Sequence, residues 1–163
     1  MDKSYISVIL PQVSDEGRLA GWLDNVFSQG VDVEVLICDR IDPERLASLG
    51  EDILAKVKVF PAQDKAVALK KAISDAQGGY ILFSDVGITY ADDAFAALLA
   101  RGVCVFNGAS ADGNLFFADF LFDEIASKNG YFCCLMNAET VQKNQILPVG
   151  GTAFSIMNMI ADY

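Results

Sequence analysis

The chain is built from short, mostly apolar runs, separated by segments in which apolar residues recur at helical spacing. Short apolar runs that end at turn-forming residues are typical of buried strands. The predicted strands are 6–10, 33–38, 56–60, 80–84, 103–107 and 131–136. Unbroken apolar strands that alternate with helices predict an α/β fold: a doubly wound, mainly parallel sheet with helices on both faces.

Capping residues mark the helices between these strands. Residues 19–27 place apolar side chains three and four positions apart, and Gly30 follows where a helix C-terminus favours glycine. Asp42 is predicted to cap a short helix that ends at Gly50, and Asp64 to cap the next helix. Further helices are expected behind Asp92 and Asp93 and over 119–128 and 138–144, and the ambiguous last segment, 154–163, is assigned as helix.

Three groups of polar or turn-forming residues follow predicted strands. Residues 11–15 follow the first strand, Asp39 follows the second and Asp85 follows the fourth. In open parallel sheets, ligands bind outside the carboxyl ends of the strands, at the point where the strand order reverses. We therefore expect these three groups to lie on one rim of the sheet and to form the site.

Each candidate residue also has a structural interpretation. Aspartate at the end of a strand often starts a turn. On this structural interpretation, Asp39 and Asp85 serve only to form turns. Asp92 and Asp93 are better explained as acids at a helix N-terminus than as ligands. Lys70 is assigned to a solvated face, with a contact to a pyrophosphate as its alternative.

Composition excludes several classes of protein. The 163 residues suit one domain, and 22 acidic against 12 basic residues give a net charge of −10, which argues against nucleic acid and anionic membranes as partners. Histidine is absent, which excludes Ser-His-Asp and Cys-His catalysis. No stretch approaches the roughly eighteen uninterrupted apolar residues of a membrane span, and a cytoplasmic location follows as the expectation. The cysteines lie in apolar runs without CxxC spacing and are expected to be buried thiols: Cys38, Cys104, Cys133 and Cys134.

Three segments in this order resemble the nucleotide-binding half of family-2 glycosyltransferases of the GT-A fold: "ISVILPQVSDEGRLAGWLDNVFSQ", "VEVLICDRID" and "GGYILFSDVG". That family shows strands that end in Pro-x-Tyr-Asn, in Asp-Asp and in Asp-x-Asp, and a helix that ends in Ser-x-x-x-Gln or Ser-Gln. The match covers 5–100, and "YFCCLMNAETVQKNQILP" is similar to a late segment of capsule- and cell-wall-type members. The resemblance implies a single domain, 1–163, with a nucleotide-binding half at 1–107 and a shortened acceptor-side half at 108–163.

The residues that follow the first two strands can be compared with the family motifs one by one. Pro11 matches the family proline, whereas Val13 and Ser14 stand where tyrosine and asparagine are usual. Asp39 matches the aspartate that recognises the base edge in the family, and Arg40 replaces the aspartate beside it. The implied ligand is a nucleotide sugar of the UDP type.

The catalytic positions depart further from the family pattern. Asp85 matches the first acid of Asp-x-Asp, which holds Mg²⁺ or Mn²⁺ against the pyrophosphate, but Gly87 replaces the second acid. The catalytic base of the family falls at 150–153, where this chain has no acid. Because the second metal-binding acid and the catalytic base are both missing, sugar transfer is expected to be weakened or lost. The catalytic residues stay unassigned.

Two alternatives remain open. One is an active transferase that uses Asp85 and an unidentified base, with Asp119 and Asp123 as candidates. The other is a scaffold that pairs with a second copy or with a partner transferase through the aromatic run at 115–122, "LFFADFLF".

Overall fold

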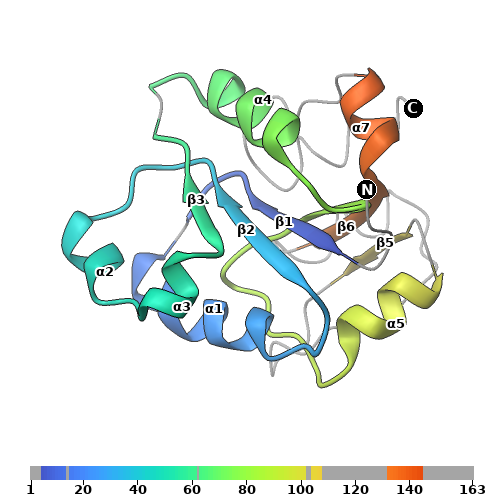
Figure 1. Cartoon of the computed structure of the whole chain (residues 1–163), viewed down its shortest axis with the longest axis horizontal. Coiled ribbons are helices and arrows are strands. Elements are labelled where there is room, and N and C mark those ends of the chain that lie inside the picture. The colour runs from blue at the N-terminus through green and yellow to red at the C-terminus, as the bar shows by residue number, and fades with distance from the viewer. Residues whose placement is uncertain (1–4, 14, 62, 102–103, 108–131, 145–163) are drawn as a thin grey trace.

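The computed structural model describes residues 5–13, 15–61, 63–101, 104–107 and 132–144 (Figure 1). Several predictions concern residues outside these ranges. They are the helices over 119–128 and 154–163, the aromatic run at 115–122, the missing acid at 150–153, and the candidate bases Asp119 and Asp123.

The strands of the described ranges form one mixed sheet of six, in the order β3-β2-β1-β4-β6-β5, at the centre of the fold. The strands are β1 (Ile6–Leu10), β2 (Val33–Ile37), β3 (Val57–Val59), β4 (Tyr80–Phe83), β5 (Cys104–Asn107) and β6 (Phe132–Asn137). Strands β3, β2, β1 and β4 are parallel to one another, and β6 is antiparallel to both β4 and β5. The predicted α/β fold with a mainly parallel sheet is therefore confirmed, with an antiparallel strand inserted near one edge.

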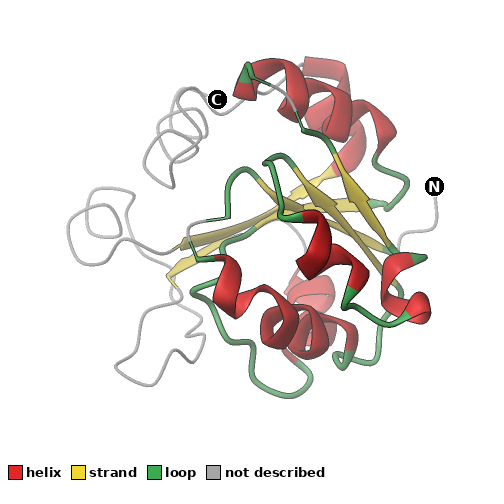
Figure 2. Cartoon of the chain, turned by 90° about the vertical axis from the view of Figure 1, so that its left-hand side faces the viewer, coloured by secondary structure: helices red, strands yellow, loops and turns green. Residues whose placement is uncertain are grey.

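Helices cover both faces of the sheet, as Figure 2 shows. The described helices are η1 (Glu16–Arg18), α1 (Leu19–Phe27), α2 (Pro43–Ala47), α3 (Glu51–Leu54), α4 (Lys65–Asp75), α5 (Ala94–Arg101) and α7 (Ala138–Asn144). Helices α1, α2, α3 and α5 lie on one side, and α4 and α7 lie on the other (Figure 1). No helix among the described residues is long and apolar enough to cross a membrane.

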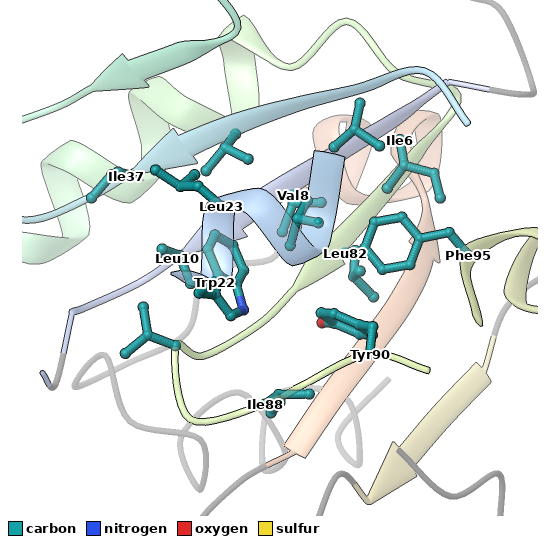
Figure 3. Close-up of a cluster of buried hydrophobic side chains, with 14 of the residues drawn as sticks. Ile6, Val8, Leu10, Trp22, Leu23, Ile37, Leu82, Ile88, Tyr90 and Phe95 are labelled. Carbon is teal, nitrogen blue, oxygen red and sulfur yellow. The ribbon is translucent and has the colours of Figure 1, made fainter. Parts of the chain in front are cut away.

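Two apolar layers hold this arrangement together. On one face, Ile6, Val8 and Leu10 of β1 pack with Trp22 and Leu23 of α1 (Figure 3). On the other face, Ile9 packs with side chains of α4 and α7. All five residues of β1 are buried because both faces are covered, which explains why the strand is mostly apolar in sequence.

The predicted caps are present. Asp42 accepts a hydrogen bond from Glu44 N, and Asp64 accepts one from Ala66 N, each at 2.9 Å. Gly30 has a φ of 73° behind α1, as a glycine at a helix C-terminus does. The single short helix expected to end at Gly50 is different in the structure, because α2 ends at Ala47 and Gly50 is the N-cap of α3.

A buried polar cluster joins β1, β2 and the chain before β4. Glu34 Oε1 accepts hydrogen bonds from Ser7 Oγ at 2.6 Å and from Gln77 N at 2.7 Å. Ser7 Oγ in turn accepts one from Gly78 N at 2.9 Å. The Lys58 ammonium lies 3.6 Å from Glu34 Oε2. The two polar residues that interrupt the apolar strands thus satisfy each other and the backbone of the next element.

Candidate functional site

The carboxyl ends of β1, β2 and β4 meet at one rim of the sheet. Leu10 pairs with Ile37 of β2, and Ile9 pairs with Phe83 of β4. The strand pairing extends one residue further on each side of β1. Cys38 N donates to Leu10 O at 2.9 Å, and Ser84 N donates to Ile9 O at 3.0 Å.

Pro11, Asp39 and Asp85 come next on these three strands, so the predicted common rim is confirmed as a location. Because β1 lies between the other two strands, the backbones at Asp39 and Asp85 are about two strand spacings, or ~10 Å, apart. The strand order reverses between β1 and β4, which is where ligands of doubly wound sheets bind.

Asp39 connects the loops that follow β1 and β2. Its Oδ2 accepts a hydrogen bond from Val13 N at 2.9 Å, and its Oδ1 accepts one from Arg40 N at 2.8 Å. The turn-forming role of this half-buried carboxyl group is therefore observed. Recognition of a base edge by Asp39 stays a prediction, and the carboxylate oxygens have further lone pairs for it.

Asp85 forms a compact turn after β4. Its Oδ1 accepts a hydrogen bond from Gly87 N at 2.8 Å, and its carbonyl oxygen accepts one from Ile88 N at 3.1 Å. The glycine that replaces the second acid of the family motif thus has its backbone N–H bound to the first acid.

A divalent cation needs several oxygen ligands. No group of three or more acidic, cysteine or histidine side chains lies together among the described residues. Asp85 supplies one carboxylate at this strand end, and Asp39 lies on the far side of β1. These residues alone do not make a metal site, and oxygen atoms from a ligand are needed to complete one.

Helix α1 fixes the far end of the loop that carries Asp85. Asn25 Nδ2 donates to Tyr90 O at 2.9 Å, and Tyr90 N donates to Asn25 Oδ1 at 2.8 Å. The Tyr90 hydroxyl group lies 2.5 Å from Ser84 Oγ in a buried hydrogen bond. Sequence reasoning missed these three residues, because an asparagine inside a helix gives no signal of a partner 65 positions away.

A hollow of about 310 Å³ opens beside this loop. It is lined by Gly17, Arg18, Gly21, Trp22 and Asn25 on the helical side and by Val86, Ile88 and Thr89 on the loop side. Arg18 is the charged residue among the described residues of this lining, and its guanidinium group lies 3.5 Å from the Asp15 carboxylate. Figure 3 labels Trp22 of α1 and Ile88 of the loop, which both belong to this lining.

Cys38 lies next to the rim but is not a nucleophile. Burial, and then the charge of Asp39, raise the pKa of its thiol to about 12. The thiol therefore stays protonated at neutral pH, and thiolate chemistry is not available. The prediction of a buried thiol is confirmed for Cys38; the side chains of Cys104, Cys133 and Cys134 lie outside the described part.

Comparisons with known proteins find likeness in structure. No family model matches the chain, and no curated protein matches it in sequence. Residues 1–349 of S. aureus TarS superpose with a TM-score of 0.63 at 17% identity, covering 96% of this chain and 53% of that chain. The same TarS segment in complex with UDP-GlcNAc gives a TM-score of 0.61 at 16% identity, over 98% of this chain and 53% of that one.

A mannosyltransferase gives a similar result. The mannosyltransferase PcManGT from Pyrobaculum calidifontis, in complex with GDP-Man and Mn²⁺, superposes with a TM-score of 0.56 at 16% identity. The alignment covers 88% of this chain and 48% of that one. The chain thus spans about half the length of the solved structures that it resembles, and at this identity the likeness establishes the fold.

Proposed function

We propose that this chain, which has the GT-A-type fold of nucleotide-sugar glycosyltransferases, binds a nucleotide diphosphate sugar at the rim formed by Pro11, Asp39 and Asp85. The observation that supports the proposal is the register of β2, β1 and β4, by which the three residues follow neighbouring strands on the rim that contains the switch point between β1 and β4. The matched structures of PcManGT and TarS are complexes with GDP-Man and with UDP-GlcNAc, which supports this class of ligand.

The two aspartates have different parts in this proposal. Asp39 is half-buried between the loops after β1 and β2, where its carboxylate is an acceptor for the N–H groups of a base edge. Asp85, on the opposite side of β1, lies at the pyrophosphate and sugar side of the ligand. An acidic group there repels a diphosphate unless a cation or N–H donors intervene, so nucleotide binding is expected to be weak without a metal ion.

A divalent cation would be held here by Asp85 and by phosphate oxygens, and it would neutralise charge on the diphosphate when bound. Glycine at position 87 removes one carboxylate from this set. We therefore expect Mg²⁺ or Mn²⁺ to improve nucleotide binding by about tenfold, less than a site with two carboxylates would give.

Transfer of the sugar is weakened or lost in this proposal. An inverting transfer needs a base within hydrogen-bond reach of the acceptor hydroxyl group. Histidine is absent from the chain, and no acid stands at 150–153. The domain then acts as a nucleotide-sugar-binding pseudoenzyme of polysaccharide biosynthesis in the cytoplasm.

Isothermal titration calorimetry tests the binding. UDP, GDP, UDP-glucose and UDP-GlcNAc are titrated into the chain with and without Mn²⁺, and saturable binding of at least one nucleotide is expected. Asp85→Asn is expected to change the affinity measured with Mn²⁺ more than the affinity measured without it. If no nucleotide binds under any condition, the proposal is wrong and the domain has a structural or interaction role.

A turnover assay distinguishes a pseudoenzyme from an active transferase. Release of nucleotide diphosphate from the same donors, with and without saccharide acceptors, is expected to stay at the background rate. Metal-dependent release that is lost in Asp85→Asn would instead establish an active enzyme.

A further inference from the structure

The loop at 85–90 is held at both of its ends. At the start, it continues β4 through Ser84, whose backbone N–H is bonded to Ile9 O of β1 at 3.0 Å. At the end, Tyr90 is buried, with its ring against Phe95 at a centroid distance of 4.7 Å and an interplanar angle of 78°. Asp85 lies between these two fixed points, so its position depends on both of them.

The end of the loop is attached to α1 by one side chain. The amide group of Asn25 donates to Tyr90 O at 2.9 Å and accepts from Tyr90 N at 2.8 Å. One planar amide group thus satisfies the donor and the acceptor of a single backbone residue, as a neighbouring strand would do. Removing it leaves two partly buried backbone groups without these partners.

The order of the loop is expected to depend on this attachment. Gly87 lies within it, and glycine loses more conformational freedom on ordering than any other residue. The Asp85 turn closes around this glycine through the 2.8 Å bond to Gly87 N. A loop whose far end is released samples more conformations, and a ligand must then order it at the expense of affinity.

We propose that Asn25 is a positioning residue, which acts through the backbone of Tyr90 to hold the loop at 85–90, and with it Asp85, at the ligand-binding rim. The proposal rests on the nucleotide site proposed above. It adds that α1, which supplies none of the three rim residues, determines how well that site is formed.

A double-mutant cycle tests this role. UDP binding in the presence of Mn²⁺ is measured for the wild type, Asn25→Ala, Asp85→Asn and the double variant. The Kd is expected to rise about tenfold in Asn25→Ala, because the loop must be ordered on binding. In the Asp85→Asn background the same substitution is expected to change the Kd less than twofold, since Asn25 acts through Asp85.

Gln29→Ala is the matched control. Gln29 is a buried amide two residues beyond the end of α1. Its Oε1 accepts from Phe95 N at 3.2 Å in α5, beyond the loop, and its Nε2 donates to Asn25 O at 3.4 Å. Both alanine variants are expected to lose thermal stability, but only Asn25→Ala is expected to lose affinity. Asn25→Asp provides a gentler variant, which keeps the acceptor for Tyr90 N and loses the donor for Tyr90 O.

The outcomes are distinguishable. Equal losses of affinity in Asn25→Ala and Gln29→Ala, or a tenfold effect of Asn25→Ala that persists in the Asp85→Asn background, overturn the positioning role and leave the nucleotide site intact. An unchanged Kd in both Asn25 variants likewise overturns the positioning role and leaves the nucleotide site intact. Absence of binding in the wild type for UDP, GDP and both UDP-sugars overturns the proposed function and this inference together.

Discussion

Among Gly17, Gly21, Gly30, Gly50 and Gly78, Gly78 is the position where one added methyl group is predicted to do most harm. It lies just before β4, beside the backbone of β1. A Cβ atom there would lie 2.6 Å from Tyr5 O and 2.7 Å from Ser7 N. Contacts shorter than 3.0 Å are essentially never seen for a Cβ atom, and both neighbours are backbone atoms that cannot rotate away. The two chain segments must therefore separate in Gly78→Ala.

The cost follows from what that separation breaks. Gly78 N donates to Ser7 Oγ at 2.9 Å, and Gln77 N donates to Glu34 Oε1 at 2.7 Å, inside the buried polar cluster. Each buried group left without its partner costs about 1–3 kcal/mol, and overpacking adds about 1–3 kcal/mol. We expect a total loss of about 3–5 kcal/mol, a large share of the roughly 5–15 kcal/mol that holds a domain together.

Chemical denaturation in urea, followed by circular dichroism, measures this loss, and the melting temperature is expected to fall by about 10 °C. Gly21→Ala is the matched control, because a Cβ atom at this exposed position inside α1 meets nothing within 4 Å. The control is expected to be stabilised by about 0.5–1 kcal/mol through helix propensity. A loss below about 1 kcal/mol in Gly78→Ala would refute the steric reasoning.

Two further changes test other features of the fold. Asp93 has a φ of 61° at the start of α5, so Asp93→Gly is expected to raise the free energy of unfolding by about 0.5–1 kcal/mol in the same denaturation assay, and destabilisation would contradict the strain at this residue. Burial raises the pKa of Cys38 to about 12, so the folded state retains a proton that an unfolded thiol releases. The contribution of this proton to the free energy of unfolding is therefore fully present below pH ~8.5 and is lost as the pH rises from there towards 12. Cys38→Ser should show a shallower fall between pH 9 and 11, and an identical slope in both proteins would contradict the assignment.

The strands were predictable because the physical cause of their pattern is simple. Both faces of β1 and β2 are covered, so their residues are apolar with few interruptions. The position of Asp39 and Asp85 on one rim followed from parallel strands in register, a constraint that the order of strands and helices already contains. The insertion of β6 between β4 and β5 was not predictable, because neighbours in sequence need not be neighbours in a sheet.

The supporting contacts of the site were hidden for a different reason. Ser7 and Glu34 interrupt apolar strands, and only the folded chain shows that they bind each other across 27 positions. Asn25 lies 65 positions from Tyr90, and no local pattern distinguishes it from a solvated helical asparagine. Long-range side-chain to backbone bonds depend on the three-dimensional packing of specific pairs, and a single sequence carries little information about them.

Substitution by asparagine separates the ligand-binding role from the structural role more clearly at Asp85 than at Asp39. Asp39 holds one backbone N–H with each carboxylate oxygen, so Asp39→Asn must place its amide nitrogen against one of these donors and disturb the loop after β1 or the turn at Arg40. Asp85→Asn, by contrast, keeps an acceptor oxygen for Gly87 N while it removes the negative charge. A change in nucleotide affinity that appears in Asp85→Asn only when Mn²⁺ is present therefore reports on charge at the rim, whereas a change in Asp39→Asn combines loss of a ligand contact with rearrangement of the loop.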